Sequence, residues 1–400
     1  MVKMYIKRSK FNILESSLSK PDVLILLGAR QVGKSTLMDE LKDKVPKGHE
    51  IKSFNLEFPD DLLFFSKSDS ELFNEFKSYE NLVLLIDEFH YLKNASKFFK
   101  AIYDLKKNIK IIASGSSSIE IHKHLKESMA GRQKTVRIYP LTYDEWSQTD
   151  GDINEFFITG GLPGLLHLDE KDEQIEYLSQ IVQTYILKDI KGFIKEENIR
   201  AFNHLLFFLA ENQGQVISTS NVANEIKMTS KTVESYLTIL EQTYVNYSLS
   251  SYSRKLSNEL KKSKKYYFYD NGIRNSLVKN FQKISTRDDK GFLYESFVFL
   301  ELHKRIKANV DLRFWRTKQG DEVDFIWIED LIPIPMEVKS DFKDTKPPKS
   351  LIKFMKNYPE SPYGIVFNES RNEEVIFQDE YKIKFVSFDR LNNEFFLDLY

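Results

Sequence analysis

The segment from Gly28 to Ser35 reads G-A-R-Q-V-G-K-S and has the spacing of a phosphate-binding loop. Its two glycines allow consecutive backbone N–H groups to converge on phosphate oxygens, and Lys34 adds a cation. The hydroxyl of Ser35 is suited to bind the Mg²⁺ that accompanies ATP. The residues that we therefore expect to bind ATP are Gly28, Ala29, Arg30, Gln31, Val32, Gly33, Lys34, Ser35 and Thr36.

Two acids, Asp87 and Glu88, directly follow the apolar run Leu82–Ile86. Ligands of open α/β sheets bind beyond the carboxyl ends of the strands, so acids at this point would face the nucleotide. Asp87 is suited to hold Mg²⁺ and Glu88 to activate the attacking water, which makes ATP hydrolysis the expected reaction. The alternative is that these acids cap the next helix. We expect His90 to be a packing or surface residue.

The small polar segment Ser114–Ser117 follows another apolar run, Ile109–Ala113. A hydroxyl at this place would position the water or contact the γ-phosphate. The same composition is also typical of an ordinary turn, and both interpretations are open on the sequence alone.

Three acids in the last third of the chain carry oxygen ligands that suit a divalent metal, and a lysine accompanies them: Glu295, Asp324 and Glu337, with Lys339. Side chains two apart in a strand share a face, so Glu337 and Lys339 point the same way. If the strand of Asp324 is adjacent, the carboxylates form one site for Mg²⁺ or Mn²⁺, with Lys339 orienting a water. The alternative is a set of exposed charges without cleavage.

Apolar runs alternate with helical segments over residues 1–150, which predicts βαβ units around a parallel sheet. The predicted strands are Val23–Leu27, Ile51–Leu56, Leu82–Ile86, Ile109–Ala113 and Thr135–Tyr139, and the predicted helices are Ser35–Lys44, Glu71–Tyr79 and Ala95–Lys106. A strand before Gly28 and a helix from Ser35 are the context in which a phosphate-binding loop occurs. We therefore expect an α/β ATPase domain here.

The middle of the chain is predicted to hold two smaller domains, a helical lid at residues 151–215 and a winged helix at residues 216–275. Thr229–Gln242 would be the helix that contacts DNA, with polar and cationic groups near its start, namely Lys227, Ser230, Lys231, Thr232 and Ser235. A patch of lysines beside aromatic rings would add to this contact, namely Lys255, Lys261, Lys262, Lys264 and Lys265 with Tyr266 and Tyr267. Alternatively, the winged helix is a lid or protein-contact module, and its lysines form a solvated face.

The formal net charge is −1, so the overall charge gives no argument for a nucleic-acid partner, and only a local basic patch does. The absence of cysteine excludes disulfides and thiolate zinc sites and fits a reducing cytoplasm. No stretch approaches the roughly 20 apolar residues that span a bilayer. We therefore expect a cytoplasmic protein without a membrane partner.

In order and content, these motifs resemble the AAA+ ATPases, and more narrowly a prokaryotic group in which an AAA-type domain (AAA_14) precedes a domain of unknown function, DUF4143. The segments that carry the resemblance are Leu26–Leu37, Leu84–Leu92, Ala113–Ser118, Ala130–Arg132, Tyr139–Trp146, Gly160–Gly164, Tyr267–Asn275, Gly291–Val298, Asp321–Ile326 and Met336–Ser340. They extend over nearly the whole chain, so their combination is more specific than any single motif.

The resemblance implies further roles in the nucleotide site. Ser116 corresponds to the sensor of the γ-phosphate, with Ser114 as the alternative. Arg132 precedes a predicted strand, where AAA+ proteins commonly carry an arginine finger that acts on the nucleotide of a neighbouring subunit. A finger in trans requires a homo-oligomer, commonly a hexameric ring. The alternative is an ordinary surface arginine.

The C-terminal set resembles the PD-(D/E)xK nucleases, with Glu295 on a helix, Asp324 in a strand, and Glu337 and Lys339 in the next strand. Val323 stands where the motif has proline, a departure that removes no ligand. The resemblance implies that residues 276–400 form an α/β domain of the restriction-endonuclease kind, while cleavage is a separate question.

Together these features predict an ATPase that uses ATP and Mg²⁺ to remodel or process DNA. Branched or forked DNA is the expected substrate, which the C-terminal domain grips or cuts. The alternative is a nucleotide-dependent switch that binds protein partners in defence or signalling and does not act on DNA. The near-neutral net charge mildly favours this alternative.

Overall fold

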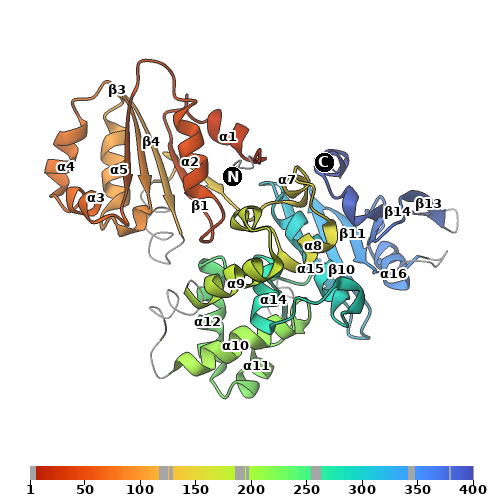
Figure 1. Ribbon diagram of the computed structural model, residues 1–400. Helices are drawn as coiled ribbons and strands as arrows, with labels where there is room; N and C mark the ends of the chain where they lie inside the picture. Colours follow the sequence, from red (N-terminus) through yellow and green to blue (C-terminus); the bar gives the residue numbers. More distant parts are fainter. Residues whose placement is uncertain are drawn as a thin grey trace. The chain divides into compact units, whose positions relative to one another are not determined.

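The computed structural model describes residues 6–116, 125, 129–184, 194, 198–253, 263–340, 347–377 and 380–399 (Figure 1). The chain forms two compact units. The first consists of Met1–Pro140 and Gln242–Tyr244, and the second of Leu141–Glu241 and Val245–Tyr400. No helix in the described part of the chain is both long and apolar enough to cross a membrane.

The first unit is built on a five-stranded parallel sheet in the order β2-β3-β4-β1-β5. Its strands are β1 (Val23–Leu27), β2 (Glu50–Asn55), β3 (Asn81–Asp87), β4 (Asn108–Gly115) and β5 (Gln133–Arg137). All five residues of β1 are buried, as expected for an apolar strand inside a parallel sheet. β4 lies between the strand that precedes the phosphate-binding loop and the strand that ends in Asp87. The predicted α/β fold of this segment is confirmed.

The helices of the first unit are α1 (Phe11–Glu15), α2 (Lys34–Lys42), α3 (Pro59–Phe64), α4 (Asp69–Phe76), α5 (Ala95–Asp104) and the 3₁₀ helix η1 (Phe89–Tyr91). Local sequence explains where several of them begin. Proline stands at the start of α3, where its missing N–H costs nothing. Ser68 and Glu71 form a capping box at α4. The three predicted helices correspond to α2, α4 and α5, with ends that differ by a few residues.

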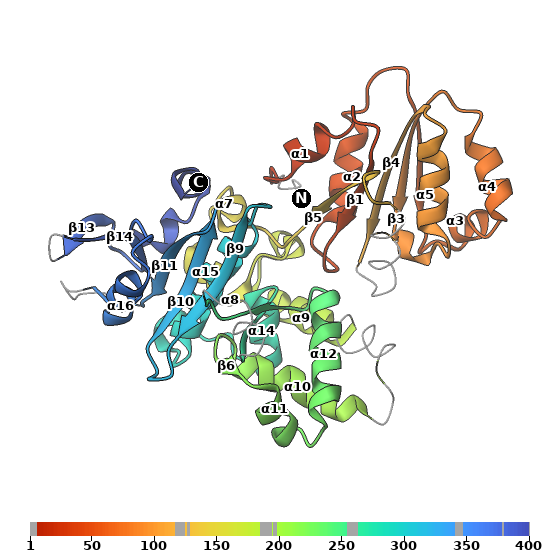
Figure 2. The same ribbon diagram turned by 180° about the vertical axis from the view of Figure 1, so that it is seen from behind.

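The second unit begins with a mostly helical part that contains a small antiparallel sheet (Figure 2). Its helices are α7 (Tyr143–Trp146), α8 (Ile153–Thr159), α9 (Lys171–Ile181), α10 (Ile199–Glu211), α11 (Thr219–Glu225), α12 (Ser230–Gln242) and α14 (Asn271–Val278), with the 3₁₀ helices η2 (Pro163–His167) and η6 (Ile284–Thr286). Its strands are β6 (Val216–Ile217), β7 (Asn246–Leu249) and β8 (Lys264–Phe268), in the order β6-β8-β7. β8 is therefore the central strand.

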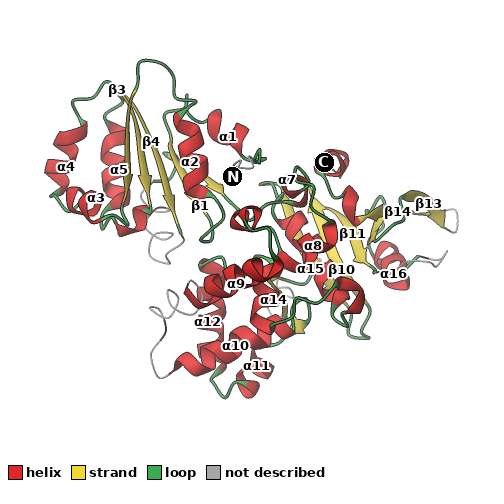
Figure 3. Ribbon diagram, in the orientation of Figure 1, coloured by secondary structure: helices red, strands yellow, loops and turns green. Residues whose placement is uncertain are grey.

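The rest of the second unit is a six-stranded mixed sheet, drawn in yellow with its red helices in Figure 3. Its strands are β9 (Val310–Arg316), β10 (Glu322–Glu329), β11 (Ile332–Val338), β12 (Gly364–Asn368), β13 (Glu373–Phe377) and β14 (Tyr381–Ser387), in the order β13-β14-β12-β11-β10-β9. Its helices are α15 (Lys290–His303), α16 (Lys349–Asn357) and α17 (Asn393–Leu399), with the 3₁₀ helix η7 (Phe388–Arg390). β9, β10 and β11 pair antiparallel, and β11, β12 and β14 pair parallel.

The glycine-rich segment after α8 is explained by the buried carboxylate of Asp270. This carboxylate accepts hydrogen bonds from the backbone N–H groups of Gly161 (2.7 Å) and Gly272 (2.8 Å). Gly160 has φ 78°, and a Cβ at this position would lie 2.0 Å from Asp270 Oδ1. Only glycine fits this place, and Asp270 thereby joins the start of α14 to the end of α8.

Candidate functional site

The phosphate-binding loop lies between β1 and α2, where the sequence predicts it. Gln31 and Gly33 have positive φ angles of 63° and 89°, which turns the backbone N–H groups of the loop inward as in an anion-binding nest. A Cβ on Gly28 would lie 2.1 Å from the carbonyl oxygen of Ile138, so glycine is required for this close approach. The loop has the backbone shape that a phosphate group needs.

The ammonium group of Lys34 is buried inside this loop. Its Nζ donates to the carbonyl oxygens of Gly28 (3.1 Å) and Ala29 (2.9 Å). Burial lowers the pKa of Lys34, and the nearby charges of Glu88 and Asp87 act in the opposite direction. Lys34 and the two acids therefore belong to one electrostatic site.

Asp87 ends β3 and contacts the neighbouring strand. The Ser114 hydroxyl, on β4, donates a hydrogen bond to Asp87 Oδ1, which also accepts the Glu88 N–H at 3.0 Å. β3 and β4 are adjacent and parallel, so their carboxyl ends bring these two side chains together. This arrangement fixes the carboxylate at the sheet edge next to the loop.

Glu88 has a left-handed backbone (φ 53°) and is held by two neighbours. Its Oε2 lies 3.0 Å from His90 Nδ1 and accepts hydrogen bonds from the Ser116 N–H (3.2 Å) and hydroxyl (3.4 Å). Burial raises the pKa of Glu88, but the His90 hydrogen bond and the charge of Lys34 outweigh it and hold the pKa at about 2. Glu88 is therefore ionised at neutral pH.

The contacts of Ser114, Ser116 and His90 add two features that the sequence did not predict. Ser114 contacts Asp87 and Ser116 contacts Glu88, so each of the two candidate sensor serines touches one acid. His90, expected to be a packing or surface residue, contacts the Glu88 carboxylate. The only local signal for this contact was the Glu-x-His spacing.

Arg132 lies at the amino ends of the strands, whereas the phosphate-binding loop lies at their carboxyl ends. Its carbonyl oxygen accepts the N–H of Val23, the first residue of β1, whereas the loop follows the last residue of β1. The guanidinium Nε is 3.2 Å from Asp104 Oδ1, and the side chain is 35% exposed. The structure therefore does not bring Arg132 to the nucleotide site of its own chain.

In the second unit, Asp324 and Glu337 lie on the paired strands β10 and β11. Asp324 Oδ2 accepts the N–H of Val338 at 2.8 Å. Glu337 is buried, its Oε2 lies 2.9 Å from Lys339 Nζ, and its Oε1 accepts the hydroxyl of Ser350. Burial and the charge of Asp324 raise the pKa of Glu337 to about 7. The two strands are adjacent, which was the condition for Asp324 and Glu337 to share one site.

Lys265, on β8, lies among three acids that we name the carboxylate cluster: Glu295, Glu322 and Asp324. Its Nζ is 3.0 Å from Glu295 Oε1, 2.7 Å from Glu322 Oε1 and 3.8 Å from Asp324 Oδ1. The Tyr267 hydroxyl donates to Glu295 at 2.6 Å. Burial raises the pKa of Glu295 to about 7, against the opposing charge of Lys265. Glu322 and Lys265 were not predicted as members of this site.

Among the described positions of the predicted basic patch, Lys264 is half-buried, whereas the prediction is wrong at Lys265, Tyr266 and Tyr267. Lys265 is 1% exposed, and the two tyrosines are 6% and 0% exposed, because β8 is the central strand of its sheet. None of the three is available to DNA. Lys255, Lys261 and Lys262 lie outside the described residues. On and before α12, by contrast, Lys227, Ser230, Lys231 and Ser235 are exposed.

The predicted metal ligands Glu295, Asp324 and Glu337 do not form one open cage. Glu295 and Asp324 share Lys265, whereas Glu337 pairs with Lys339. Within the ranges that the structure describes, no three His, Asp or Glu side chains gather in positions that would hold a metal ion.

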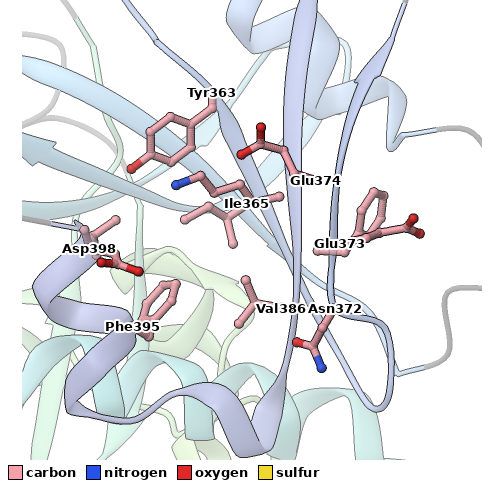
Figure 4. Close-up of a pocket in the computed structure, with 11 residues that line it drawn as sticks. Tyr363, Ile365, Asn372, Glu373, Glu374, Val386, Phe395 and Asp398 are labelled. Atoms are coloured by element: carbon pink, nitrogen blue, oxygen red, sulfur yellow. The ribbon is translucent and has the colours of Figure 1, made fainter.

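A cavity of about 240 Å³ lies beside the β13–β14 hairpin. Tyr363, Ile365 and Phe395 line it, as Figure 4 shows. The Lys384 ammonium lies over the Tyr363 ring, 4.2 Å from its centroid. None of the predicted site residues lines this cavity.

Three family models match successive parts of the chain. An AAA domain model (AAA_14) matches residues 20–147, a domain of unknown function (DUF8612) matches residues 150–284, and a second domain of unknown function (DUF4143) matches residues 290–388. The family resemblance seen in the sequence is confirmed for its AAA-type and DUF4143 parts.

Whole-chain relatives are more distant. An uncharacterized protein of Haemophilus influenzae is 26% identical over 349 residues, which cover 80% of this chain and 83% of the relative. An uncharacterized protein of Methanocaldococcus jannaschii is 24% identical over 417 aligned positions, which cover 94% and 89%.

Among solved structures, the Pif1 helicase of Candida albicans matches with a TM-score of 0.27 and 17% identity, over 44% of this chain and 48% of the helicase chain. Drosophila ORC bound to AT-rich DNA and Cdc6 matches with a TM-score of 0.26 and 13% identity, over 68% and 90%. Both TM-scores are too low to carry an argument. The family models, together with the parallel sheet and its phosphate-binding loop, show that the chain has an N-terminal domain similar to AAA domains, which bind nucleotides, followed by a C-terminal segment similar to DUF4143.

Proposed function

We propose that this protein hydrolyses ATP with Mg²⁺ in its first unit and uses the energy to remodel DNA that its second unit holds. One observation carries the ATPase part of the proposal. Lys34, Asp87 and Glu88 meet at the carboxyl edge of one parallel sheet, beside a loop with the backbone shape of a phosphate cradle. The AAA domain match over residues 20–147 supports the same conclusion.

The side chains of this site divide the work of hydrolysis. Lys34 leaves the carbonyl oxygens of Gly28 and Ala29 to bind the β- and γ-phosphates. Ser35 and Asp87 would hold Mg²⁺, and the chemistry that the ion would supply there is neutralisation of phosphate charge. Glu88, ionised and oriented by His90 and Ser116, accepts a proton from the attacking water.

The trans role of Arg132 is part of the proposal. Its place at the far edge of the sheet from its own loop, and its partly exposed side chain, support action on a neighbouring subunit. The proposed assembly is a homo-oligomer, with a hexameric ring as the form most commonly built on such contacts.

The helical part of the second unit supports a winged-helix assignment for residues 216–275. α11 and α12 are followed by the β7–β8 pair, and β6 completes the small sheet. α12 presents exposed polar groups at its start, where a recognition helix meets DNA, and Lys227 and Lys231 supply the positive charge.

The C-terminal part supports a nuclease-like fold for residues 276–400. The helix α15 carries Glu295, and the antiparallel strands β9, β10 and β11 follow, with Asp324 and Glu337 on neighbouring strands. The metal role of Glu295, Asp324 and Glu337 with Lys339, which the sequence predicts, is not part of this proposal. We assign to this part DNA holding rather than cleavage, because the Lys265 ammonium group already lies between Glu295 and Asp324.

Turnover of ATP in the presence of different DNAs tests the proposal. We expect branched or forked DNA to raise the turnover rate of the wild-type protein more than duplex or single-stranded DNA of equal length. If no DNA changes the rate or binds at low salt, the DNA part of the proposal is refuted. Retention of a protein partner without DNA would then favour the switch.

A further inference from the structure

The ammonium group of Lys265 is almost completely withdrawn from water, with 1% exposure of the side chain. A buried ammonium group is costly unless its charge and its hydrogen-bond donors are satisfied. The carboxylate cluster satisfies them, with Glu295 and Glu322 at 3.0 Å and 2.7 Å and Asp324 at 3.8 Å. The three acids need Lys265 for the same reason, because they would otherwise repel one another in a poorly solvated place.

A divalent metal between these carboxylates would compete for the same space. Mg²⁺ binds carboxylate oxygens at about 2.0–2.1 Å, and it would have to lie between oxygens that already contact Nζ. An ammonium group and a dication at this separation repel strongly in a buried site. The space between these carboxylates can therefore hold either the Lys265 ammonium group or a metal ion, but not both.

The backbone around Lys265 holds the lysine in place. β8 pairs with β7 on one side and with β6 on the other. The ring of Tyr267, two residues further along β8, is fully buried and stacks on Phe299 of α15 with centroids 4.0 Å apart. This packing fixes the position of the backbone from which the Lys265 side chain reaches the carboxylate cluster.

We propose that Lys265 is the resident cation of the carboxylate cluster and that it keeps Mg²⁺ and Mn²⁺ out of this site. Cleavage that depends on a metal ion bound by Glu295, Glu322 and Asp324 is then not expected of the intact chain. Lys265 also joins the small sheet of β6, β7 and β8 to the sheet that carries Asp324. The inference does not depend on the ATPase proposal, because it concerns residues of the second unit only.

Mn²⁺ binding to the nucleotide-free protein, followed by electron paramagnetic resonance, tests this inference. All variants carry Asp87→Asn, so that Mn²⁺ at the nucleotide site does not contribute. We expect the protein with an intact carboxylate cluster and the Asp324→Asn variant to bind Mn²⁺ equally weakly. Lys265→Met should gain one Mn²⁺ site, at least about tenfold tighter than background, since hard oxygen ligands then lack a cation.

Two further variants make the result specific. Lys264→Met removes an equal charge from the neighbouring residue, whose ammonium group donates to the Ser248 hydroxyl (3.3 Å), and it should gain no site. Adding Asp324→Asn to Lys265→Met should remove the gained site. A folded Lys265→Met protein without the gain would contradict the inference.

The comparison between the intact cluster and Asp324→Asn remains decisive if Lys265→Met does not fold. Tight Mn²⁺ binding by the intact cluster that Asp324→Asn abolishes would overturn the inference outright. Equal, weak binding by both proteins supports it. A thermal unfolding scan with and without Mn²⁺ gives a second readout, in which the intact cluster should show no shift that depends on Asp324.

Discussion

Single residues at the carboxyl edge of the first sheet determine whether the protein can turn over ATP. The Lys34 ammonium group must move from carbonyl oxygens of its own loop to the phosphates. Its hydrogen bonds to these oxygens, at 3.1 Å and 2.9 Å, already hold it inside the phosphate-binding loop. Glu88 needs no such change, because its contacts with His90 and Ser116 already orient it. The expected effects of substitution differ accordingly.

Lys34→Ala should lower the turnover rate by at least about 100-fold, because the positive charge at the transferred phosphate is lost. Steady-state phosphate release measures it. The matched control is Lys42→Ala on the same helix, whose ammonium group pairs with Asp39 at the surface. The control should keep the wild-type rate. An equal loss of turnover rate in both variants would mean that substitution anywhere in α2 lowers the rate, and that the phosphate contact of Lys34 is not the cause.

The pH dependence of turnover should show no protonation of Glu88 between pH 5 and 8, because its folded-state pKa is about 2. Because the pKa of the Glu88 carboxyl is lowered, the ionised base is present above about pH 2 and is protonated only below it. His90→Ala removes a hydrogen bond that favours the ionised form, so the acid limb of kcat should move to higher pH. A pH–rate profile of both proteins measures this, and unchanged acid limbs would contradict the assigned contact.

The site residues also show how far sequence alone could go. The motif Gly28–Ser35, Asp87 and Glu88 are adjacent to buried strands, so their type and place could be predicted locally. Lys265 could not, because its partners are contributed by α15 and β10 and only the folded chain brings them together. Within the run of lysines before Tyr266, a buried lysine and a solvated one look alike.

At the scale of elements, apolar strands were easier to predict than edges. β1, β3 and β4 are short buried runs, and the strands of Asp324 and Glu337, which are β10 and β11, were also expected from the sequence. Strands beyond Val338 were not predicted. β13 is an edge strand with a mostly exposed face, which weakens its pattern, although β14 alternates regularly between buried and half-buried residues.

The free energy of unfolding should depend on the Asp270 carboxylate, which joins the end of α8 to the start of α14. Asp270→Ala removes the acceptor of the Gly161, Gly272 and Ile273 N–H groups and leaves them unpaired in a buried place. We expect a loss of about 2–4 kcal/mol in unfolding free energy, from the lost helix cap and the unpaired donors. Urea denaturation measures it.

The control for this substitution is Ser218→Ala, which removes the cap of the exposed start of α11. It should cost only about 0.5–2 kcal/mol, because water replaces the lost acceptor. A similar cost for both variants would argue against a special role for the buried junction.

Exposed charge at the start of α12 should control DNA affinity. The double variant Lys227→Ala, Lys231→Ala should bind duplex and branched DNA more weakly, with a salt slope reduced by about 2, one for each phosphate contact. Fluorescence anisotropy over a salt series measures it. Lys171→Ala, Lys283→Ala removes the same charge from other exposed positions and should leave the slope unchanged. Equal slopes in all three proteins would remove α12 from the DNA contact.

At the scale of the whole molecule, the place of Arg132 predicts cooperation between copies of the chain. Arg132→Ala and Lys34→Ala should each be nearly inactive alone, and mixing them should restore part of the turnover. The intact loop of the first variant then receives Arg132 from the second. Mixing Arg132→Ala with the double variant Lys34→Ala, Arg132→Ala should restore nothing. Absence of rescue in the first mixture, at concentrations where sedimentation shows oligomers, would contradict a trans role.

The position of Lys265 in the chain has a practical consequence for work on the C-terminal part. The segments 276–400 and 290–388 both include the acids of the carboxylate cluster but begin after the lysine that neutralises them. An isolated fragment that begins at either boundary would therefore contain Glu295, Glu322 and Asp324 without the lysine that pairs with them. Metal affinity of these acids in such a fragment would result from the loss of Lys265, so it has to be measured again in the intact chain.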